Sequence, residues 1–252
     1  MPARTQLSVS RMGDRSVIVR SQSESPLRLL APKNHGHGAW VYQSSYGGGF
    51  VGADDLSLNI GVEAGATLFL SSQASSKVYR ASRSRYSLAA TLHPESTLIS
   101  WPDPVVCFAG ASLVQEQSFE LQPSSSLICV DSFSAGRIAR GERWAFEALS
   151  SRISLNIGNE RLLHDSMLLS SRHGSLPDRM GATELIATIV LAGDRLSALC
   201  DSLHAELTSA PLRSPSEHPH FVSSRRSWGL LVRASSPSIE EFHRALRQLL
   251  QP

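Results

Sequence analysis

A short pattern occurs three times in this chain, and it limits the folds that the chain can adopt. The copies are residues 62–69 (VEAGATLF), 92–99 (LHPESTLI) and 121–128 (LQPSSSLI). Each copy contains an apolar residue, a turn, a small polar residue and an apolar strand. The copies start thirty and then twenty-nine residues apart. Strand-built repeats with a period in this range indicate stacked β-units, as in a solenoid or a flattened β-helix. An antiparallel sandwich also has strands at regular spacing, so three copies leave that alternative open.

A glycine run before the first copy satisfies the spacing of a dinucleotide-binding loop, but its context does not. Such a loop precedes a helix whose N-terminal amides bind the pyrophosphate. The residues after the run 47–52 (GGGFVG) instead alternate between apolar and polar, which is the period of a strand. A nucleotide site is therefore excluded, and no Gly-Lys-Ser/Thr sequence supports a P-loop. We interpret Gly47, Gly48 and Gly49 as a turn or a place where two backbone segments approach closely.

Charge and composition exclude several classes of function. The net charge is +2, and the 24 basic residues are spread along the chain without interleaved aromatic residues, so we expect no nucleic-acid partner. Residues 1–10 lack the apolar core of a signal peptide, and no apolar run is long enough to cross a bilayer. Three cysteines share no short spacing, and we expect buried free thiols in a cytoplasmic protein: Cys107, Cys129 and Cys200.

The last third of the chain changes from a strand pattern to a helical one. The run 185–191 (LIATIVL) predicts a buried strand or the start of a helix, and apolar residues from 196 to 207 follow at helical spacing. Residues 209–220 predict an exposed Ser/Pro loop, and 229–233 predict a strand. The final helix is expected to begin near Ser238, with Glu241 completing a capping box.

We therefore predict a single domain over residues 1–252. Its β-rich core covers about 15–192, and a helix, the Ser/Pro loop, a strand and the terminal helix make up 193–252.

Five motifs occur in a fixed order along the chain: 29–32 (LLAP), 45–49 (SYGGG), 73–80 (QASSKVYR), 102–108 (PDPVVCF) and 136–144 (GRIARGERW). Gly52 and Asp54 accompany the second motif. Together the motifs resemble one known family, that of the urease accessory protein UreD, which is called UreH in some organisms. Ala53 departs from the family pattern, which has glycine there.

The resemblance implies both a fold and a role. The fold would be mainly β, a stacked two-sheet arrangement like a β-helix with C-terminal α-helices. The protein would be a non-catalytic scaffold that binds apo-urease and, with UreF and the GTPase UreG, enables nickel insertion. Nickel(II) would be transient cargo in an internal passage, and no cofactor would be tightly bound.

The family motifs and the segments beside them supply the candidate site residues. Nickel(II) accepts oxygen ligands, so five carboxylates are candidates for a transient nickel path. Turn hydrogen bonds are the alternative role for the first two, and ion pairs are the alternative for the last two. These carboxylates are Asp54, Asp55, Asp103, Asp131 and Glu142.

Other motif residues are assigned structural or partner-binding roles. We interpret Gln73 and Tyr79 as buried hydrogen-bonding groups, and the glycine run as part of an interface or turn. Four cations would repel a divalent ion unless they pair with carboxylates or contact partner proteins: Lys77, Arg80, Arg137 and Arg140.

Two other functions stay open on the sequence alone. A β-solenoid can carry the chemistry of a polysaccharide-cleaving enzyme, and a generic β-rich module can bind partners outside the urease system. The chain has no Gly-x-Ser-x-Gly elbow, no His-Glu-x-x-His and no cysteine paired locally with histidine. An enzyme would turn over a substrate in isolation, whereas a scaffold would copurify with its partners.

Overall fold

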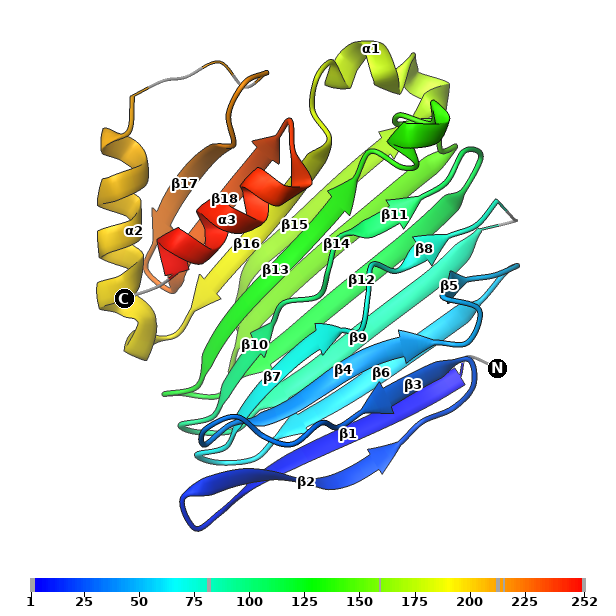
Figure 1. Ribbon diagram of the computed structural model, residues 1–252. Helices are drawn as coiled ribbons and strands as arrows, with labels where there is room; N and C mark the ends of the chain where they lie inside the picture. Colours follow the sequence, from blue (N-terminus) through cyan, green and yellow to red (C-terminus); the bar gives the residue numbers. More distant parts are fainter. Residues whose placement is uncertain (1–2, 81–82, 159, 212–213, 215, 251–252) are drawn as a thin grey trace.

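The computed structural model consists of two β-sheets that face each other, with two helices packed on the outer face of one of them (Figure 1). It describes residues 3–80, 83–158, 160–211, 214 and 216–250. Sheet A contains, in spatial order, β15 (Glu160–Ser170), β14 (Ala148–Ile157), β12 (Ser112–Leu121), β9 (Ser84–Leu92), β6 (Asp55–Val62), β1 (Ala3–Met12) and β2 (Arg15–Gln22).

Sheet B lies opposite and has a main path of long strands with three short strands beside it. The main path is β17 (His220–Arg226), β18 (Gly229–Ser236), β16 (Leu185–Ala192), β13 (Ser126–Ser134), β10 (Thr97–Ser100), β7 (Thr67–Ser72), β4 (Ala39–Ser45) and β3 (Leu27–Leu30). The short strands are β5 (Gly49–Phe50), β8 (Lys77–Val78) and β11 (Val105–Cys107). The helices are α1 (Leu176–Met180), α2 (Ser197–Ser209) and α3 (Ile239–Leu250).

The chain coils between the two sheets, which confirms the solenoid-like interpretation of the repeat. It passes from β6 in sheet A to β7 in sheet B, then to β9, β10, β12 and β13 in alternation. Strands of successive coils are parallel and in register, so that Leu68 lies beside Leu98 and Leu98 beside Leu127. Each repeat copy therefore places its apolar residue at the same level of the core between the sheets.

The turn in each repeat depends on one residue with a left-handed backbone. Gly65, Glu95 and Ser124 occupy equivalent positions and have φ angles of 67°, 60° and 66°. This backbone geometry closes the turn. The N–H of the next residue then donates back across it, from Ala66 to the Glu63 carbonyl and from Ser96 to the His93 carbonyl. A residue with a Cβ pays about 1–2 kcal/mol for this conformation, whereas glycine does not.

Replacing Glu95 by glycine should stabilise the protein. We expect Glu95→Gly to raise the free energy of unfolding by about 0.5–1 kcal/mol, because the relieved strain exceeds the extra entropy of glycine in the unfolded chain. Ser124→Gly is the matched comparison, and it should be close to neutral because it also removes the Ser124 hydroxyl that accepts from the Glu95 N–H at 3.1 Å. Urea unfolding measures both, and equal effects of the two changes would contradict this explanation.

The C-terminal third agrees with most of the sequence predictions. Residues 185–192 form a strand, β16, and Ser238 caps α3 by accepting from the Glu241 N–H at 3.3 Å. The described residues of the predicted Ser/Pro loop are exposed at 211, 214 and 216–218, while 212–213 and 215 lie outside the described residues. All three cysteines are buried and free, as predicted. The sequence analysis missed β17 and β1, and β1 belongs to sheet A although the β-rich core was expected to start near residue 15.

Apolar side chains form three clusters that leave a polar zone between two of them. One cluster fills the space between the sheets around the repeat turns, and a second lies between the sheets around Phe133 and Trp144. The third packs α2 and α3 against the outer face of sheet B through residues such as Phe242 and Leu203. In the described part of the chain, no helix combines the length and apolar character that crossing a membrane requires.

Candidate functional site

Sheet B is interrupted where β7 and β10 end. The chain leaves β7 at Ser72 and resumes pairing in β8, and it leaves β10 at Ser100 and resumes pairing in β11. Because β8 pairs with β5 and β11, and β11 pairs with β13, the sheet continues beyond the interruption. Residues 73–76 and 101–104 therefore border a gap that we call the sheet-B opening. Residues 73–76, Pro102 and Asp103 line a cavity of ≈ 160 Å³ that also contacts the inner face of sheet A.

Polar side chains line the inner part of this cavity, although it lies between two apolar clusters. They come from inward-facing positions of both sheets, and we refer to them as the interior polar cluster. Its members that line the cavity are Gln43, Ser72, Ser100 and Asp131 from sheet B and Tyr86, Gln115 and Gln117 from sheet A. The cluster also includes Ser151 of β14, which binds Asp131.

Asp131 is the buried acid of the interior polar cluster. Its side chain accepts from the Gln115 amide at 2.6 Å and from the Ser151 hydroxyl at 2.7 Å, and the residue is 4 % exposed. Burial raises the pKa of Asp131 to about 6, since an ionised carboxylate is poorly solvated there, while the hydrogen bonds from Ser151 and Gln115 oppose the shift. Asp131 therefore changes its protonation state at about pH 6.

This raised pKa should make stability depend on pH in a defined direction. The folded state favours protonated Asp131, so its contribution is fully present below the usual pKa of 3.8 and is lost as the pH rises through about 6. We expect the unfolding free energy of the protein, relative to Asp131→Asn, to fall by about 2–3 kcal/mol between pH 4 and pH 7.5. Urea unfolding of both proteins at the two pH values measures this, and a difference that does not change with pH would contradict it.

Neutral hydrogen-bonding groups surround Asp131 in the cavity. The Tyr86 hydroxyl donates to the Gln43 side-chain carbonyl at 2.5 Å, and burial raises the pKa of Tyr86, so its phenol stays protonated. Ser132 also lines the cavity and is 3 % exposed, and its hydroxyl has no hydrogen-bond partner in the described structure. The cavity thus offers amide and hydroxyl oxygens beside a single buried carboxylate.

The rim of the opening combines a carboxylate with a histidine from the terminal helix. Asp103 lines the cavity, and its backbone N–H donates to the Ser72 hydroxyl at 2.8 Å. Burial lowers the pKa of His243 on α3, and the negative charge of Asp103 opposes that shift, so the two side chains lie close enough to interact electrostatically. α3 therefore flanks the sheet-B opening.

The structure separates the five predicted carboxylates into two groups. Asp103 and Asp131 line the cavity, and the hydrogen-bond partners of Asp131 are neutral groups. The other three are not among the described residues that line it. Asp54 makes the expected turn bond by accepting from the Val51 N–H at 2.7 Å, and Asp55 is exposed at the start of β6. Glu142 forms the expected ion pair, with Arg137.

The glycine run is a site of close backbone approach, as the sequence suggested. A Cβ atom on Gly49 would lie 1.9 Å from the Lys77 carbonyl oxygen, so no side chain fits where β5 pairs with β8. Gly47 and Gly48 have φ angles of 83° and 71°, and Gly48 lines the cavity. The run therefore allows β5 to complete the border of sheet B beyond the opening.

The remaining predicted motif residues lie outside the cavity or at its edge. Gln73 lines the cavity but is exposed, so its interpretation as a buried group is wrong; it lies in the loop that borders the opening, where it accepts from the Ser44 hydroxyl. Tyr79 is half-buried and directs its hydroxyl to the Gly47 carbonyl at 3.4 Å. The Arg137 guanidinium packs 4.1 Å from the centre of the Phe108 ring, and three other cations are exposed: Lys77, Arg80 and Arg140.

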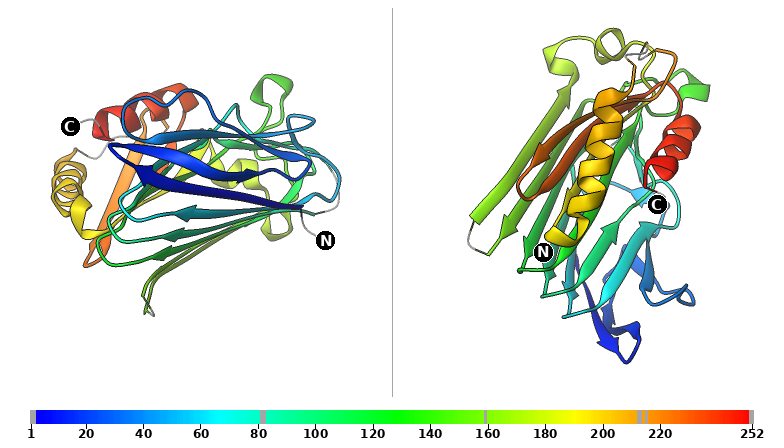
Figure 2. Two further views of the ribbon diagram at one scale, coloured as in Figure 1. Left: turned by 90° about the horizontal axis from the view of Figure 1, so that it is seen from below. Right: turned by 90° about the vertical axis from the view of Figure 1, so that its left-hand side faces the viewer.

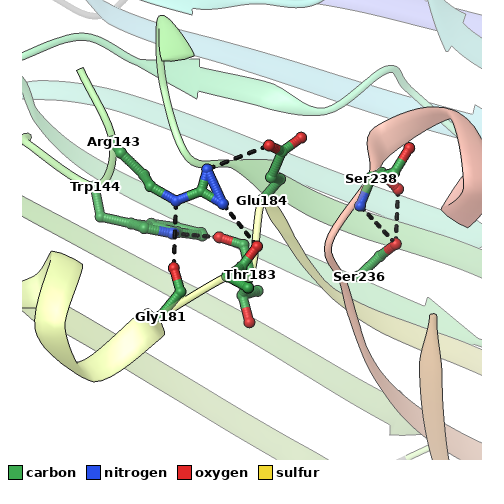
Figure 3. A network of polar contacts seen from close by, with 8 residues as sticks. Arg143, Trp144, Gly181, Thr183, Glu184, Ser236 and Ser238 are labelled. Carbon is green, nitrogen blue, oxygen red and sulfur yellow. Dashed lines mark hydrogen bonds and ion pairs between the residues drawn. The ribbon is translucent and has the colours of Figure 1, made fainter. Parts of the chain in front are cut away.

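The last family-like motif, 136–144, anchors a loop to the segment before β16 (Figure 3). Trp144 is 1 % exposed, and its indole N–H donates to the Thr183 carbonyl at 2.7 Å. Arg143 donates to the Ala182 carbonyl at 2.6 Å and pairs with Glu184 at 3.2 Å. These contacts hold the end of the sandwich beside the second apolar cluster, which indicates a structural role.

Sequence reasoning missed several residues that build the cavity. Gln115 and Gln117 were detectable in principle, because they occupy two inward positions of β12, a strand whose other inward positions hold Leu113, Phe119 and Leu121. Polar residues at core positions of a strand signal a buried polar site. In the described part of the chain, no three His, Cys, Asp or Glu side chains gather in a way that could hold a metal ion.

Comparison with known proteins gives matches over the whole chain. The family model described as "UreD urease accessory protein" matches residues 1–252. A urease accessory protein UreD of Sorangium cellulosum (strain So ce56) is 41 % identical over 249 residues, which cover 97 % of this chain and 78 % of the relative. A UreD protein of Anaeromyxobacter sp. (strain Fw109-5) is 38 % identical, with 97 % and 83 % covered. Urease accessory protein D of Oryza sativa subsp. indica is 32 % identical, with 96 % and 89 % covered.

Proposed function

The chain belongs to the UreD family of urease accessory proteins, and on that basis we propose that it is a non-catalytic maturation factor for urease. It binds apo-urease in the cytoplasm and acts with a UreF-like protein and a UreG-like GTPase. Nickel(II) is its transient cargo, and the ion is passed on to the urease active site.

The observation that carries the nickel role is the cavity between the sheet-B opening and the buried Asp131. Solvent reaches the opening at Gln73 and Ala74, which are exposed, and the same cavity contacts the inner face of sheet A. A buried polar cavity in the core is costly unless it has a use, since apolar residues would pack there more favourably. The cluster therefore supports an internal position for a polar ligand.

The chemistry of the interior polar cluster suits a cation that is held briefly. Nickel(II) accepts oxygen ligands, and amide and hydroxyl oxygens bind it weakly. Asp131 supplies one carboxylate, which burial keeps largely protonated below pH 6. Near or below pH 6, an arriving divalent cation favours the ionised form and releases the proton, and its departure allows the proton to return. At higher pH the carboxylate is already ionised, and the hydrogen bonds from Gln115 and Ser151 stabilise its charge when no cation is bound.

Asp103 gives the cation a first contact at the rim. It lines the same cavity beside the exposed loop 73–76, so that a carboxylate faces the ion before it enters. His243 on α3 adds an imidazole near this carboxylate. Burial lowers the pKa of His243, which favours the neutral form of the imidazole. A neutral imidazole is a nickel ligand, whereas an imidazolium is not.

Asp131→Asn tests the nickel role against a matched exposed acid. In cells that express urease, the UreF-like protein and the UreG-like GTPase, Asp131→Asn should lower nickel per urease on the order of tenfold, the scale of losing a group that supports a metal. Asp55→Asn makes the same chemical change on an exposed residue and should leave nickel unchanged. Equal nickel content with both variants, at equal levels of the variant chains, would sink the role of the cavity.

A further inference from the structure

An ion pair joins the two sheets at the side where β15 and β18 lie. Arg233 of β18 donates to the Asp165 carboxylate of β15 and to the Thr188 hydroxyl of β16 at 3.1 Å. In the right-hand view of Figure 2, β15 (yellow-green) and the hairpin of β17 and β18 (orange) flank the same side of the molecule. Arg233 therefore spans from sheet B to the end strand of sheet A.

The ion pair lies in line with Asp131. The strand register places Asp131 beside Thr188 and Thr188 beside Arg233. Neighbouring strands are about 5 Å apart, and residues paired across a sheet point to the same face, so Thr188 lies next to Asp131 and Arg233 lies one strand further. Asp165 is also close enough to act electrostatically on Asp131. Polar side chains thus continue from the cavity to the far side of the sandwich.

The two partners differ in their exposure to solvent. The Asp165 side chain is 12 % exposed, and the Arg233 side chain is 47 % exposed. A carboxylate that is mostly buried requires a cation or hydrogen bonds, whereas a half-exposed arginine can swing into water at small cost. Arginine is always charged and cannot act as a metal ligand. While it contacts Asp165, its charge repels any divalent cation nearby.

We propose that Arg233 is a displaceable counter-cation that closes the deep end of the interior polar cluster, and that a divalent cation reaching Asp131 and Asp165 takes its place. When the ion leaves, Arg233 returns to Asp165. This role rests on the proposed function, since it takes nickel(II) as the cargo.

Nickel(II) binding to the purified full chain tests this role without urease. Arg233→Met keeps most of the aliphatic stem and removes the charge. It should tighten the Kd for Ni²⁺ by roughly three- to tenfold, because the cation no longer competes with a positive charge for the carboxylates. Arg233→Lys keeps the charge and should bind like the unmodified chain. Arg152→Met is the control. Arg152 is also a half-exposed arginine in an ion pair, with Glu116 on sheet A, and its replacement should leave the Kd for Ni²⁺ unchanged.

The gain in affinity must also depend on the buried acid. Asp131→Asn combined with Arg233→Met should cancel it. Isothermal titration calorimetry measures the Kd for Ni²⁺ of each protein. The role of Arg233 would be overturned if Arg233→Met and the unmodified chain gave the same Kd, or if neither bound Ni²⁺ measurably. If the affinity rises as expected but urease acquires nickel normally with Asp131→Asn, the nickel route through Asp131 fails while the counter-cation role stands.

Discussion

A tryptophan at Ala74 is expected to block urease maturation. Ala74 is exposed and lines the cavity at the sheet-B opening, so a larger side chain there does not have to fit into the packed core. An indole ring covers roughly 150–250 Å² of surface and would close an opening that leads to a cavity of ≈ 160 Å³. We expect nickel per urease, and with it urease activity, to fall at least about tenfold.

The matched control is Ala205→Trp, which adds the same side chain to an exposed position of α2 away from the cavity. It should leave nickel content and activity unchanged. Both variants should unfold within about 0.5 kcal/mol of the unmodified chain, since both changes are at the surface. Copurification of apo-urease with Ala74→Trp would separate a blocked opening from a lost interface. Full maturation with Ala74→Trp would show that cargo does not use this opening.

Trp144→Ala should cause the largest loss of stability. Trp144 is fully packed in the second apolar cluster, and its indole N–H binds the Thr183 carbonyl. Truncation leaves a cavity and an unpaired carbonyl, and the expected loss is about 3–5 kcal/mol in the free energy of unfolding. Trp40→Ala is the comparison, because Trp40 is half-buried and packs on Phe69. Its loss should be about 1–2 kcal/mol, and equal losses in urea unfolding would contradict the anchoring role of Trp144.

The sequence predicted the coiled path of the chain because its repeat is local. Gly65, Glu95 and Ser124 stand at equivalent turn positions, so aligning the copies also aligned their strands. The choice between a solenoid and a sandwich needed the structure, because pairing of β7 with β10 is a long-range property that spacing alone does not determine. β1 was not predicted, because its apolar alternation is short: of its buried residues Thr5, Leu7 and Val9, only the last two are apolar.

The candidate site was predictable only in part. Asp103 and Asp131 were found because they lie in or beside the motifs, and both line the cavity. Gln115 was missed although it breaks an apolar alternation, since a glutamine in a strand has no special chemistry on its own. Arg233 and Asp165 could not be joined from sequence, because 68 residues separate them and only the folding of β15 against β18 brings them together.

The loop chemistry shows the same limit. The sequence left a choice between turn bonds and metal binding for Asp54, and between an ion pair and metal binding for Glu142. The hydrogen bond to Val51 and the pairing with Arg137 supply partners for both. Such choices depend on which backbone N–H or guanidinium the fold brings near, and a motif does not contain that information.

The most direct measurement is the nickel content of urease that is matured with and without this chain. Urease, the UreF-like protein and the UreG-like GTPase would be expressed together in both cultures, and nickel would be determined at equal amounts of urease protein. The proposed function predicts nickel-loaded, active urease only when the chain is present. Equal nickel content and equal activity in both cultures would contradict it.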